Sequence, residues 1–155
     1  VADSLRDSGL APDRLVLEIT ETALLQDGPG TVAMIEALQK MGAEIAIDDF
    51  GIGNSSITYL RRFPFDRLKI DQSFVAEMTQ NHRTTEIVRA VIAMAHGLNM
   101  TVTAEGIETE AQLALLRSLG CDEGQGFHLG HPVPQDQVAQ SLQQMGRKAL
   151  VTVSS

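Results

Sequence analysis

Short β-branched apolar runs alternate along this chain with longer segments of helical periodicity, and this alternation restricts the possible fold more than any other feature. Strands that alternate with helices in this way are typical of βα units with a parallel sheet. The sequence therefore predicts an α/β fold built from five such units. The predicted strands are Leu15 to Ile19, Glu44 to Asp48, Arg67 to Ile70, Thr101 to Ala104 and Gly124 to Phe127.

Segments with recognisable helix ends lie between the predicted strands. Glycines such as Gly42 and Gly120 follow two of them, where a left-handed C-terminal cap is expected. Thr109 and Gln112 have the spacing of a capping box at the start of another. The predicted helices are Val1 to Ser8, Thr31 to Met41, Glu86 to Leu98, Glu110 to Leu119 and a final helix after Pro134.

Composition is that of one globular domain. The 155 residues are 43% hydrophobic and 21% charged, and no apolar run approaches the roughly 18 residues of a membrane span. The net charge of −8 argues against polymeric nucleic acid as a partner. With Cys121 as the single cysteine and no signal-peptide pattern at the start, we expect a cytoplasmic setting. We interpret Cys121 as a small buried residue, and Met34, Met94 and Met100 as core residues.

Charged or amide residues stand at the carboxyl end of every predicted strand. In parallel α/β folds the ligand site lies outside these ends, so residues that are distant in sequence meet there. A single acid at such a position is more often a helix cap or a solvated residue, but its recurrence at five strand ends favours a common site. The residues are Glu18, Asp48, Asp49, Lys69, Asp71, Glu105 and Gln125.

Four of these residues, Glu18, Asp48, Asp49 and Glu105, would bring carboxylates into one small volume. Without a counter-charge the carboxylates would repel one another, whereas divalent cations would keep them ionised. Because the donors are oxygens and no Cys or His cluster accompanies them, the site suits Mg²⁺ or Mn²⁺. A pair of ions about 3.5 to 4 Å apart is an arrangement that cleaves phosphodiesters. Lys69 is expected to remain a cation that orients water or offsets phosphoryl charge.

Five segments resemble, in order, the motifs of one known family. LEITE at 17–21 resembles LELTE, DDFGIGNSS at 48–56 resembles DDFGTGYSS, and LKIDQSFV at 68–75 resembles LKIDRSFV. AEGIET at 104–109 resembles AEGVET, and QGFHLGHPVP at 125–134 resembles the QGY-to-P segment near the family's C-terminus. Together these motifs resemble the EAL family of bacterial cyclic-di-GMP phosphodiesterases over nearly the whole chain.

The resemblance implies a TIM-type (β/α)8 barrel, of which residues 1–145 hold about the last five βα units, with a tail of unknown role at 146–155. It implies hydrolysis of cyclic-di-GMP to linear pGpG with two Mg²⁺ or Mn²⁺ ions. The implied metal residues are Glu18, Asp48, Asp49 and Glu105. Lys69 would contact the catalytic water, and Glu105, Gln125 and Asp71 would complete the site.

The resemblance also implies a supporting loop after Asp49. Glu21 and Glu108 would fix this loop, which links substrate, metals and a homodimer interface in the family. Gly51 and Gly53 suit turns that require a positive φ. The loop departs from the family pattern at Ile52 and Asn54, where Thr or Ala and an aromatic residue are usual.

The family's EAL tripeptide and the strand that carries an Asn are absent from this sequence, so we expect the chain by itself to be inactive. Five βα units do not close an eight-stranded barrel. Two alternatives remain open at this point. One is a non-catalytic EAL module that binds cyclic-di-GMP or a protein partner. The other is a fragment that borrows strands from a second copy, with an exposed edge at Leu15 to Ile19.

Overall fold

The computed structural model describes residues 1–20, 23, 30–51 and 60–145. Its strands form one five-stranded sheet in the order β1-β2-β3-β4-β5, and every neighbouring pair is parallel. The strands are β1 (Val16–Thr20), β2 (Glu44–Phe50), β3 (Arg67–Ile70), β4 (Thr101–Ala104) and β5 (Glu123–Gly124). The α-helices are α1 (Ala2–Ser8), α3 (Gly30–Lys40), α5 (Gln72–Glu77), α6 (His82–Gly97), α7 (Glu110–Ser118) and α8 (Val138–Met145). The described part of the chain also contains two short 3₁₀ helices, η1 (Pro12–Arg14) and η2 (Gln135–Gln137).

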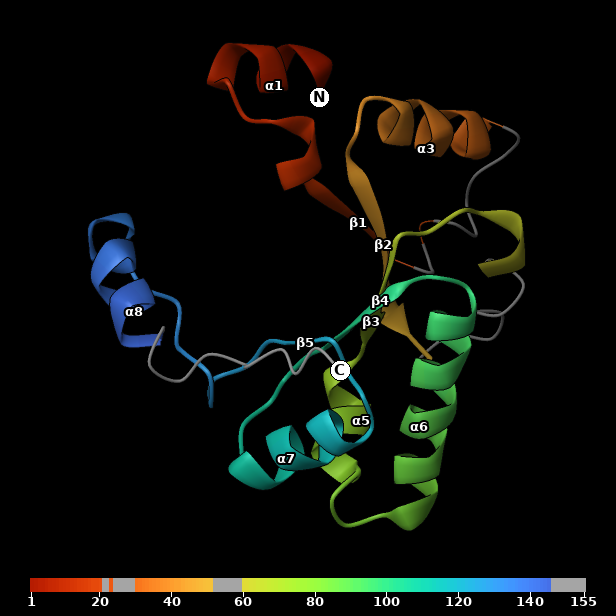
Figure 1. Ribbon diagram of the computed structural model, residues 1–155, viewed down its shortest axis with the longest axis vertical. Coiled ribbons are helices and arrows are strands. Elements are labelled where there is room, and N and C mark those ends of the chain that lie inside the picture. Colours follow the sequence, from red (N-terminus) through yellow and green to blue (C-terminus); the bar gives the residue numbers. More distant parts are fainter. Residues whose placement is uncertain (21–22, 24–29, 52–59, 146–155) are drawn as a thin grey trace.

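The prediction of an α/β fold with five parallel strands in chain order is confirmed. Each strand pairs with the next one along the sequence, and helices connect them, as in a section of a (β/α)8 barrel. The described strands leave two open sheet edges, at β1 and at β5. Figure 1 shows the sheet at the centre, with α5, α6 and α7 gathered around its β3 to β5 side.

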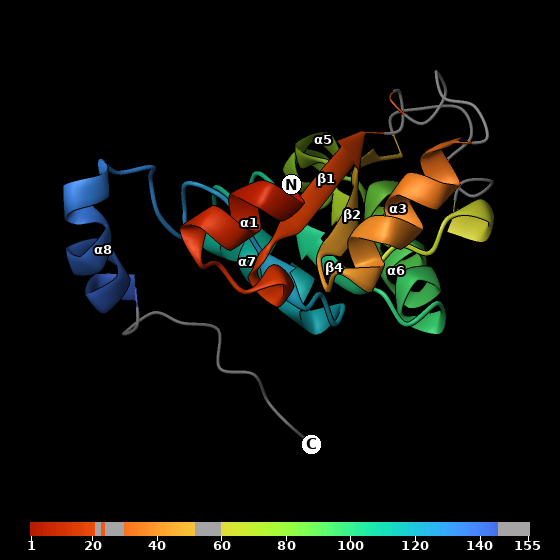
Figure 2. The ribbon, with the colours of Figure 1, turned by 90° about the horizontal axis from the view of Figure 1, so that it is seen from above.

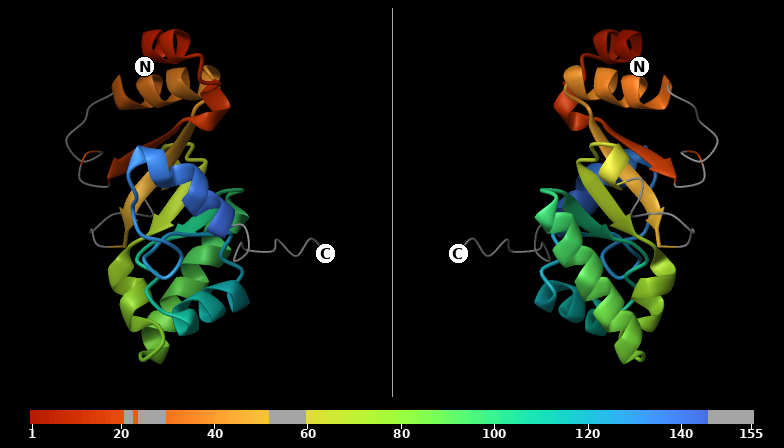
Figure 3. Two further views of the ribbon diagram at one scale, coloured as in Figure 1. Left: turned by 90° about the vertical axis from the view of Figure 1, so that its left-hand side faces the viewer. Right: turned by 90° about the vertical axis from the view of Figure 1, so that its right-hand side faces the viewer.

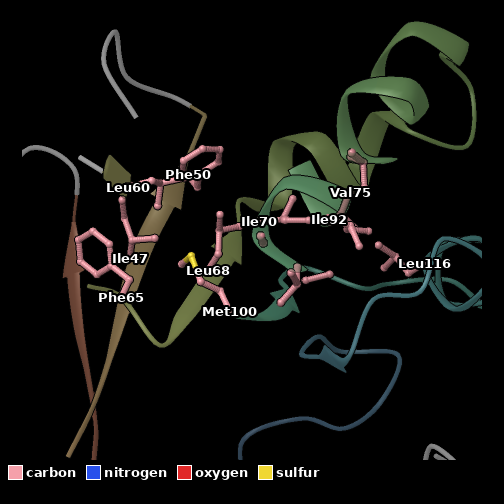
Figure 4. Packing of buried hydrophobic residues seen from close by; sticks show 14 of the residues in the cluster. Ile47, Phe50, Leu60, Phe65, Leu68, Ile70, Val75, Ile92, Met100 and Leu116 are labelled. Carbon is pink, nitrogen blue, oxygen red and sulfur yellow. The ribbon is translucent and has the colours of Figure 1, made fainter. Parts of the chain in front are cut away.

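The hydrophobic core lies between the sheet and the helices that pack on it. Ile47, Leu68 and Ile70 project from the middle strands and are almost fully buried. They pack in one cluster with Ile92 of α6 and Leu116 of α7 (Figure 4). Because successive strand residues point to opposite faces, burial of Leu68 and Ile70 against the helices turns Arg67 and Lys69 to the other face of the sheet.

Local signals in the sequence account for several helix ends. Thr109 and Gln112 form the predicted capping box at the start of α7. Gly42 and Gly120 have φ angles of 99° and 80°, as the expected left-handed residues after α3 and α7. Asn81 accepts backbone hydrogen bonds from Arg83 and Thr84 and thereby begins α6 four residues earlier than predicted.

Two predicted positions need correction. The last strand covers Glu123–Gly124 rather than 124–127, because the chain turns away from β4 after two paired residues. Met34 is 51% exposed instead of buried. It neighbours Ile35, the fully buried residue of α3, and one step along a helix rotates a side chain by about 100° away from that face. In addition, α5, a helix of 6 residues that begins just beyond β3 after the Asp71 cap, was not predicted from the sequence.

The C-terminal helix α8 stands apart from the sheet and its covering helices, as Figures 1 and 2 show, and in the left-hand view of Figure 3 it lies in front of the sheet because it is seen from that side. The preceding segment, with η2, connects it to the turn after β5. Within the described ranges, no helix combines the length and the apolar character needed to cross a membrane. The predicted tail at 146–155 lies outside the described residues.

Candidate active site

Two adjacent aspartates lie near the end of β2, where the backbone is irregular. In a regular strand, the side chains of Asp48 and Asp49 would point to opposite faces of the sheet. Here the register with β3 shifts between Ile47 and Phe50, and Asp49 has a φ of 56°. This bulge, with a left-handed residue in it, lets both carboxylates reach the same site at the strand end. The Asp49 amide also donates a hydrogen bond of 3.0 Å to the Asp48 carboxylate.

Lys69 is the centre of the charges at this end of the sheet. Its Nζ lies 2.6 Å from a Glu105 oxygen, 2.8 Å from a Glu18 oxygen and 3.1 Å from an Asp48 oxygen. The side chain is only 8% exposed. Burial alone would lower the pKa of Lys69, but its hydrogen bonds to Glu105, Glu18 and Asp48 outweigh burial and raise the pKa above the usual value. These surroundings favour the protonated form of Lys69, and its charge in the reaction stays a prediction.

Three carboxylates form a compact group beside Lys69. Asp48, Asp49 and Glu105 each offer an oxygen, and these oxygens all lie within 4.8 Å of one another. Desolvation, followed by repulsion from Asp48 and Asp71, raises the pKa of Asp49, although Lys69 opposes the shift. A cation bound among these oxygens would relieve that repulsion, so the group fits a divalent ion with a preference for oxygen ligands. Glu18 contacts Lys69 and is not a member of this group.

A pocket of about 280 Å³ opens next to the three carboxylates. Acidic and amide side chains make up most of its wall. Among the lining residues, Phe127 supplies the apolar side chain. The lining residues are Asp49, Asp71, Gln72, Glu105, Gly106, Glu108, Gln125, Gly126 and Phe127. The structure thus brings five of the predicted site residues, from β2 and from the segments that follow β3, β4 and β5, around one cavity.

Backbone hydrogen bonds hold the pocket wall on its Gln125 side. The amide of Gln125 donates to Ala104 at 2.8 Å, and its carbonyl accepts from Ile107 at 3.0 Å. Gly126 then passes so close to Ile107 that an added Cβ would lie 2.2 Å from the Ile107 backbone. Gln125 therefore projects from a segment that is fixed against the loop after β4.

Asp71 has a structural role that can be read directly from its contacts. It is 6% exposed, and its carboxylate accepts a hydrogen bond of 2.8 Å from the Ser73 amide as the N-cap of α5. Glu108 also lines the pocket, and its amide donates to the Gln112 side chain at 2.9 Å. Gly51 has the expected positive φ, at 102°, and a Cβ there would meet the Phe74 ring.

Some predicted residues lie outside the described part of the chain, namely Glu21, Gly53, Ile52 and Asn54. Conversely, four residues line the pocket although no role was predicted for them: Gln72, Gly106, Gly126 and Phe127. Gly106 follows the end of one predicted strand, so the rule that sites lie beyond strand ends could have included it, whereas Gly126 lies within the last predicted strand. Nothing in the sequence alone indicated the exposure of Phe127.

Comparison with known proteins supports one family throughout. The model of the EAL domain family matches residues 1–132. The bifunctional diguanylate cyclase/cyclic di-GMP phosphodiesterase MucR of Pseudomonas aeruginosa is 42% identical over 146 residues, which are 92% of this chain and 21% of MucR. The chain thus spans about a fifth of the length of the curated relatives that it matches.

Solved structures have the same fold at similar identity. The EAL domain of Mycobacterium smegmatis DcpA superposes with a TM-score of 0.87 and 40% identity, covering 92% of this chain and 64% of that one. Klebsiella pneumoniae BlrP1, solved as a manganese/cy-diGMP complex, gives a TM-score of 0.79 and 36% identity, covering 84% of this chain and 33% of that one. Sequence and fold agree in these matches, and the chain belongs to the EAL domain family.

Proposed function

We propose that this chain forms part of a phosphodiesterase domain that hydrolyses cyclic-di-GMP to linear pGpG with two Mg²⁺ or Mn²⁺ ions. The observation that carries the proposal is the buried Lys69, held by three carboxylates beside the group of Asp48, Asp49 and Glu105. MucR is named as a phosphodiesterase for this dinucleotide, and BlrP1 was solved with the dinucleotide and manganese.

The metal residues of the proposal are Asp48, Asp49 and Glu105, with Glu18 as a further ligand. Divalent ions held there would acidify the attacking water and polarise the phosphodiester. Glu18 lies close enough to join them only if its carboxylate leaves Lys69, which it contacts at 2.8 Å. The remaining ligands of two ions would come from strands beyond the five described here.

Lys69 contributes a fixed positive charge to the proposed reaction. An ammonium group has three N–H donors, and three carboxylates lie within reach of Nζ. Contact with the attacking water therefore requires that one carboxylate turn away, which a bound cation would favour. Because the pKa of Lys69 is raised, the group stays protonated, so it stabilises negative charge and does not act as a base.

The pocket also suits the two chemical parts of a nucleotide. Its acidic floor fits cations that bind a phosphodiester, while the Phe127 ring at the rim is 58% exposed and offers a flat apolar face. Phe127 stacks on His131 with ring centroids 4.7 Å apart, which restrains the ring. An exposed aromatic ring beside a phosphate site provides a platform for a nucleobase.

The test is hydrolysis of cyclic-di-GMP by a polypeptide that contains this sequence and the remaining strands of the barrel. We expect turnover with Mg²⁺ or Mn²⁺, and a fall of kcat by about a hundredfold or more in Asp48→Asn and in Lys69→Met. Glu86→Gln on the exposed surface of α6 is the matched control, because it also removes a carboxylate but lies outside the pocket lining.

Each outcome of this experiment has a distinct meaning. Binding of cyclic-di-GMP with no hydrolysis would mean that the protein is a receptor and not an enzyme, which is the alternative left open by the sequence. Failure to bind the dinucleotide in the presence of either ion would contradict the proposal altogether. Equal loss of activity in Glu86→Gln and Asp48→Asn would show that the effect is not specific to the site.

A further inference from the structure

A second cation-centred group lies on the same face of the sheet as Lys69. Arg67 precedes Lys69 by two residues on β3, so the two side chains project to the same face, one layer apart. Four residues form what we call the Arg67 cluster, one from each of four neighbouring strands: Glu44 of β2, Arg67 of β3, Thr103 of β4 and Glu123 of β5. None of them lines the pocket.

The guanidinium of Arg67 bridges two carboxylates that are far apart in the sheet. Its Nε donates to Glu44, and its Nη1 donates to a Glu123 oxygen at 2.5 Å. The Thr103 hydroxyl donates to that same Glu123 oxygen at 3.0 Å. The Arg67 side chain is 21% exposed, and its hydrogen bonds to Glu123 and Glu44 raise its pKa further. One planar cation thus joins β2, β3 and β5.

Strand β5 is short, and apart from Arg67 it is held mainly by hydrogen bonds to β4 and to the loop after β4. It is 2 residues long, and only Thr103↔Glu123 and Ala104↔Gly124 pair it with β4. Arg67 reaches it across β4, because β3 and β5 are not neighbours in the sheet. Gln125 follows Glu123 by two residues and leads directly into Gly126 and Phe127 of the pocket wall. A shift of Glu123 would therefore strain the hydrogen bonds that hold Gln125 against Ala104 and Ile107.

We propose that Arg67 is a positioning residue: by bridging Glu44 and Glu123 it fixes β5 on the sheet and so places Gln125 in the pocket. Arg67 acts through β5 and touches no pocket atom. This inference rests on the proposed function for its kinetic consequence, but the fixation of β5 can be measured without any activity.

The activity-independent test is hydrogen exchange in the polypeptide with the complete barrel. The amide of Gln125, which donates to Ala104, reports directly on whether β5 stays in place. We expect it to exchange at least about tenfold faster in Arg67→Met, while amides in the middle of α6 stay unchanged. Arg89→Met is the matched control, since Arg89 forms an ion pair on the exposed face of α6. Unchanged exchange at Gln125 would overturn the proposal.

The kinetic test is a double-mutant cycle with Gln125. We expect Arg67→Met to lower kcat/KM by on the order of ten to a hundredfold, and to add little to the loss already caused by Gln125→Ala. Losses that simply multiply would show that Arg67 does not act through Gln125. If Arg67→Met fails to fold, Glu123→Gln takes its place, since it weakens the same bridge and keeps the shape of the side chain.

The variant Arg67→Lys tests whether Arg67 must bridge Glu44 and Glu123 or need only supply a positive charge. Arg67→Lys keeps the charge, but a lysine lacks the planar fork that reaches two carboxylates together. We expect this variant to resemble Arg67→Met in the exchange of the Gln125 amide. Full protection in Arg67→Lys would refute the bridge. Absence of hydrolysis in the unmodified protein would contradict the proposed function, and the exchange experiment would still decide the role of Arg67.

Discussion

Asp49 combines an unfavourable backbone with an unfavourable charge, and both features concern the proposed metal site. Its φ of 56° lies in the left-handed region, which costs most residues about 1 to 2 kcal/mol but is better tolerated by Asp and Asn. Desolvation and the neighbouring Asp48 and Asp71 raise its pKa. A cation bound by Asp49 would explain why this position keeps both the strained backbone and the charge repulsion.

Substitution of Asp49 can separate these two effects. In Asp49→Asn the backbone remains tolerated and the repulsion is removed, so we expect unchanged or slightly higher stability without metal. In Asp49→Ala the left-handed residue loses its tolerant side chain, and we expect stability to fall by about 1 kcal/mol. Both variants should lose most of the rise in Tm that Mn²⁺ produces. A normal Mn²⁺ effect in Asp49→Asn would remove Asp49 from the proposed ligands.

Cys121 is expected to be a poorly reactive thiol. The residue is half-buried, and its Sγ donates to the Glu123 carbonyl at 3.2 Å. Burial raises the pKa of the thiol to about 11. Near pH 8 the folded protein therefore holds about a hundredfold less thiolate than the unfolded chain, and alkylation by iodoacetamide should be slower by a similar factor. Equal rates in folded and urea-unfolded protein would contradict this expectation.

The same shift gives a pH dependence of stability with a defined sign. Below the pKa of an unfolded cysteine the thiol is protonated in both states, so it adds no pH dependence. As the pH rises toward about 11, the unfolded chain loses its proton first, and the free energy of unfolding falls. In Cys121→Ser, the free energy of unfolding, measured by urea denaturation at several alkaline pH values, should fall less than in the unmodified protein.

At the scale of elements, the segment after β5 depends on the absence of a side chain at Gly126. A Cβ at this position would lie 2.2 Å from the backbone nitrogen and oxygen of Ile107. We expect Gly126→Ala to destabilise the protein by about 2 kcal/mol or more, because one of the two backbones must shift. Gly97→Ala is the matched control. Its Cβ would meet nothing within 4 Å, and a helical alanine should stabilise by about 0.5 kcal/mol.

Urea unfolding of both glycine variants measures the difference. Similar stabilities for Gly126→Ala and Gly97→Ala would mean that the contact with Ile107 is looser than the structure has it. A loss confined to Gly126→Ala, together with weaker cyclic-di-GMP binding, would link this close packing to the pocket wall.

Most elements could be predicted because their signals are local. The capping box at Thr109 and the glycine after α3 depend only on neighbouring residues, and both were correct. The omitted helix α5 is too short for a periodic pattern, and it depends on the Asp71 cap. β5 was misplaced because its two residues are defined by pairing with β4, which is a long-range property.

At the scale of the whole molecule, the open edges of the sheet determine whether the isolated chain self-associates and whether it can hydrolyse substrate. The five described strands leave β1 and β5 without further neighbours, and an eight-stranded barrel needs three more strands to close. We expect the 155-residue polypeptide alone to hydrolyse no cyclic-di-GMP and to self-associate, whereas a version with all eight strands should be active.

Light scattering after gel filtration and the hydrolysis assay test this expectation together. A monodisperse monomer with normal turnover would refute it. A dimer with restored activity would instead support the borrowing of strands from a second copy. The homodimer expected from the family stays a prediction, and the mass of the complete barrel measures it directly.

The sequence by itself determined the strand order, the parallel sheet and the gathering of acids at the strand ends, because periodicity and the rule for sites in parallel sheets require only local patterns. The tertiary structure decided the rest. It set three carboxylates around Lys69, turned Asp48 and Asp49 to one site through a bulge, and extended Arg67 across β4 to Glu123. These contacts join residues that are distant in the chain, and their geometry depends on register and side-chain direction, which no sequence spacing specifies.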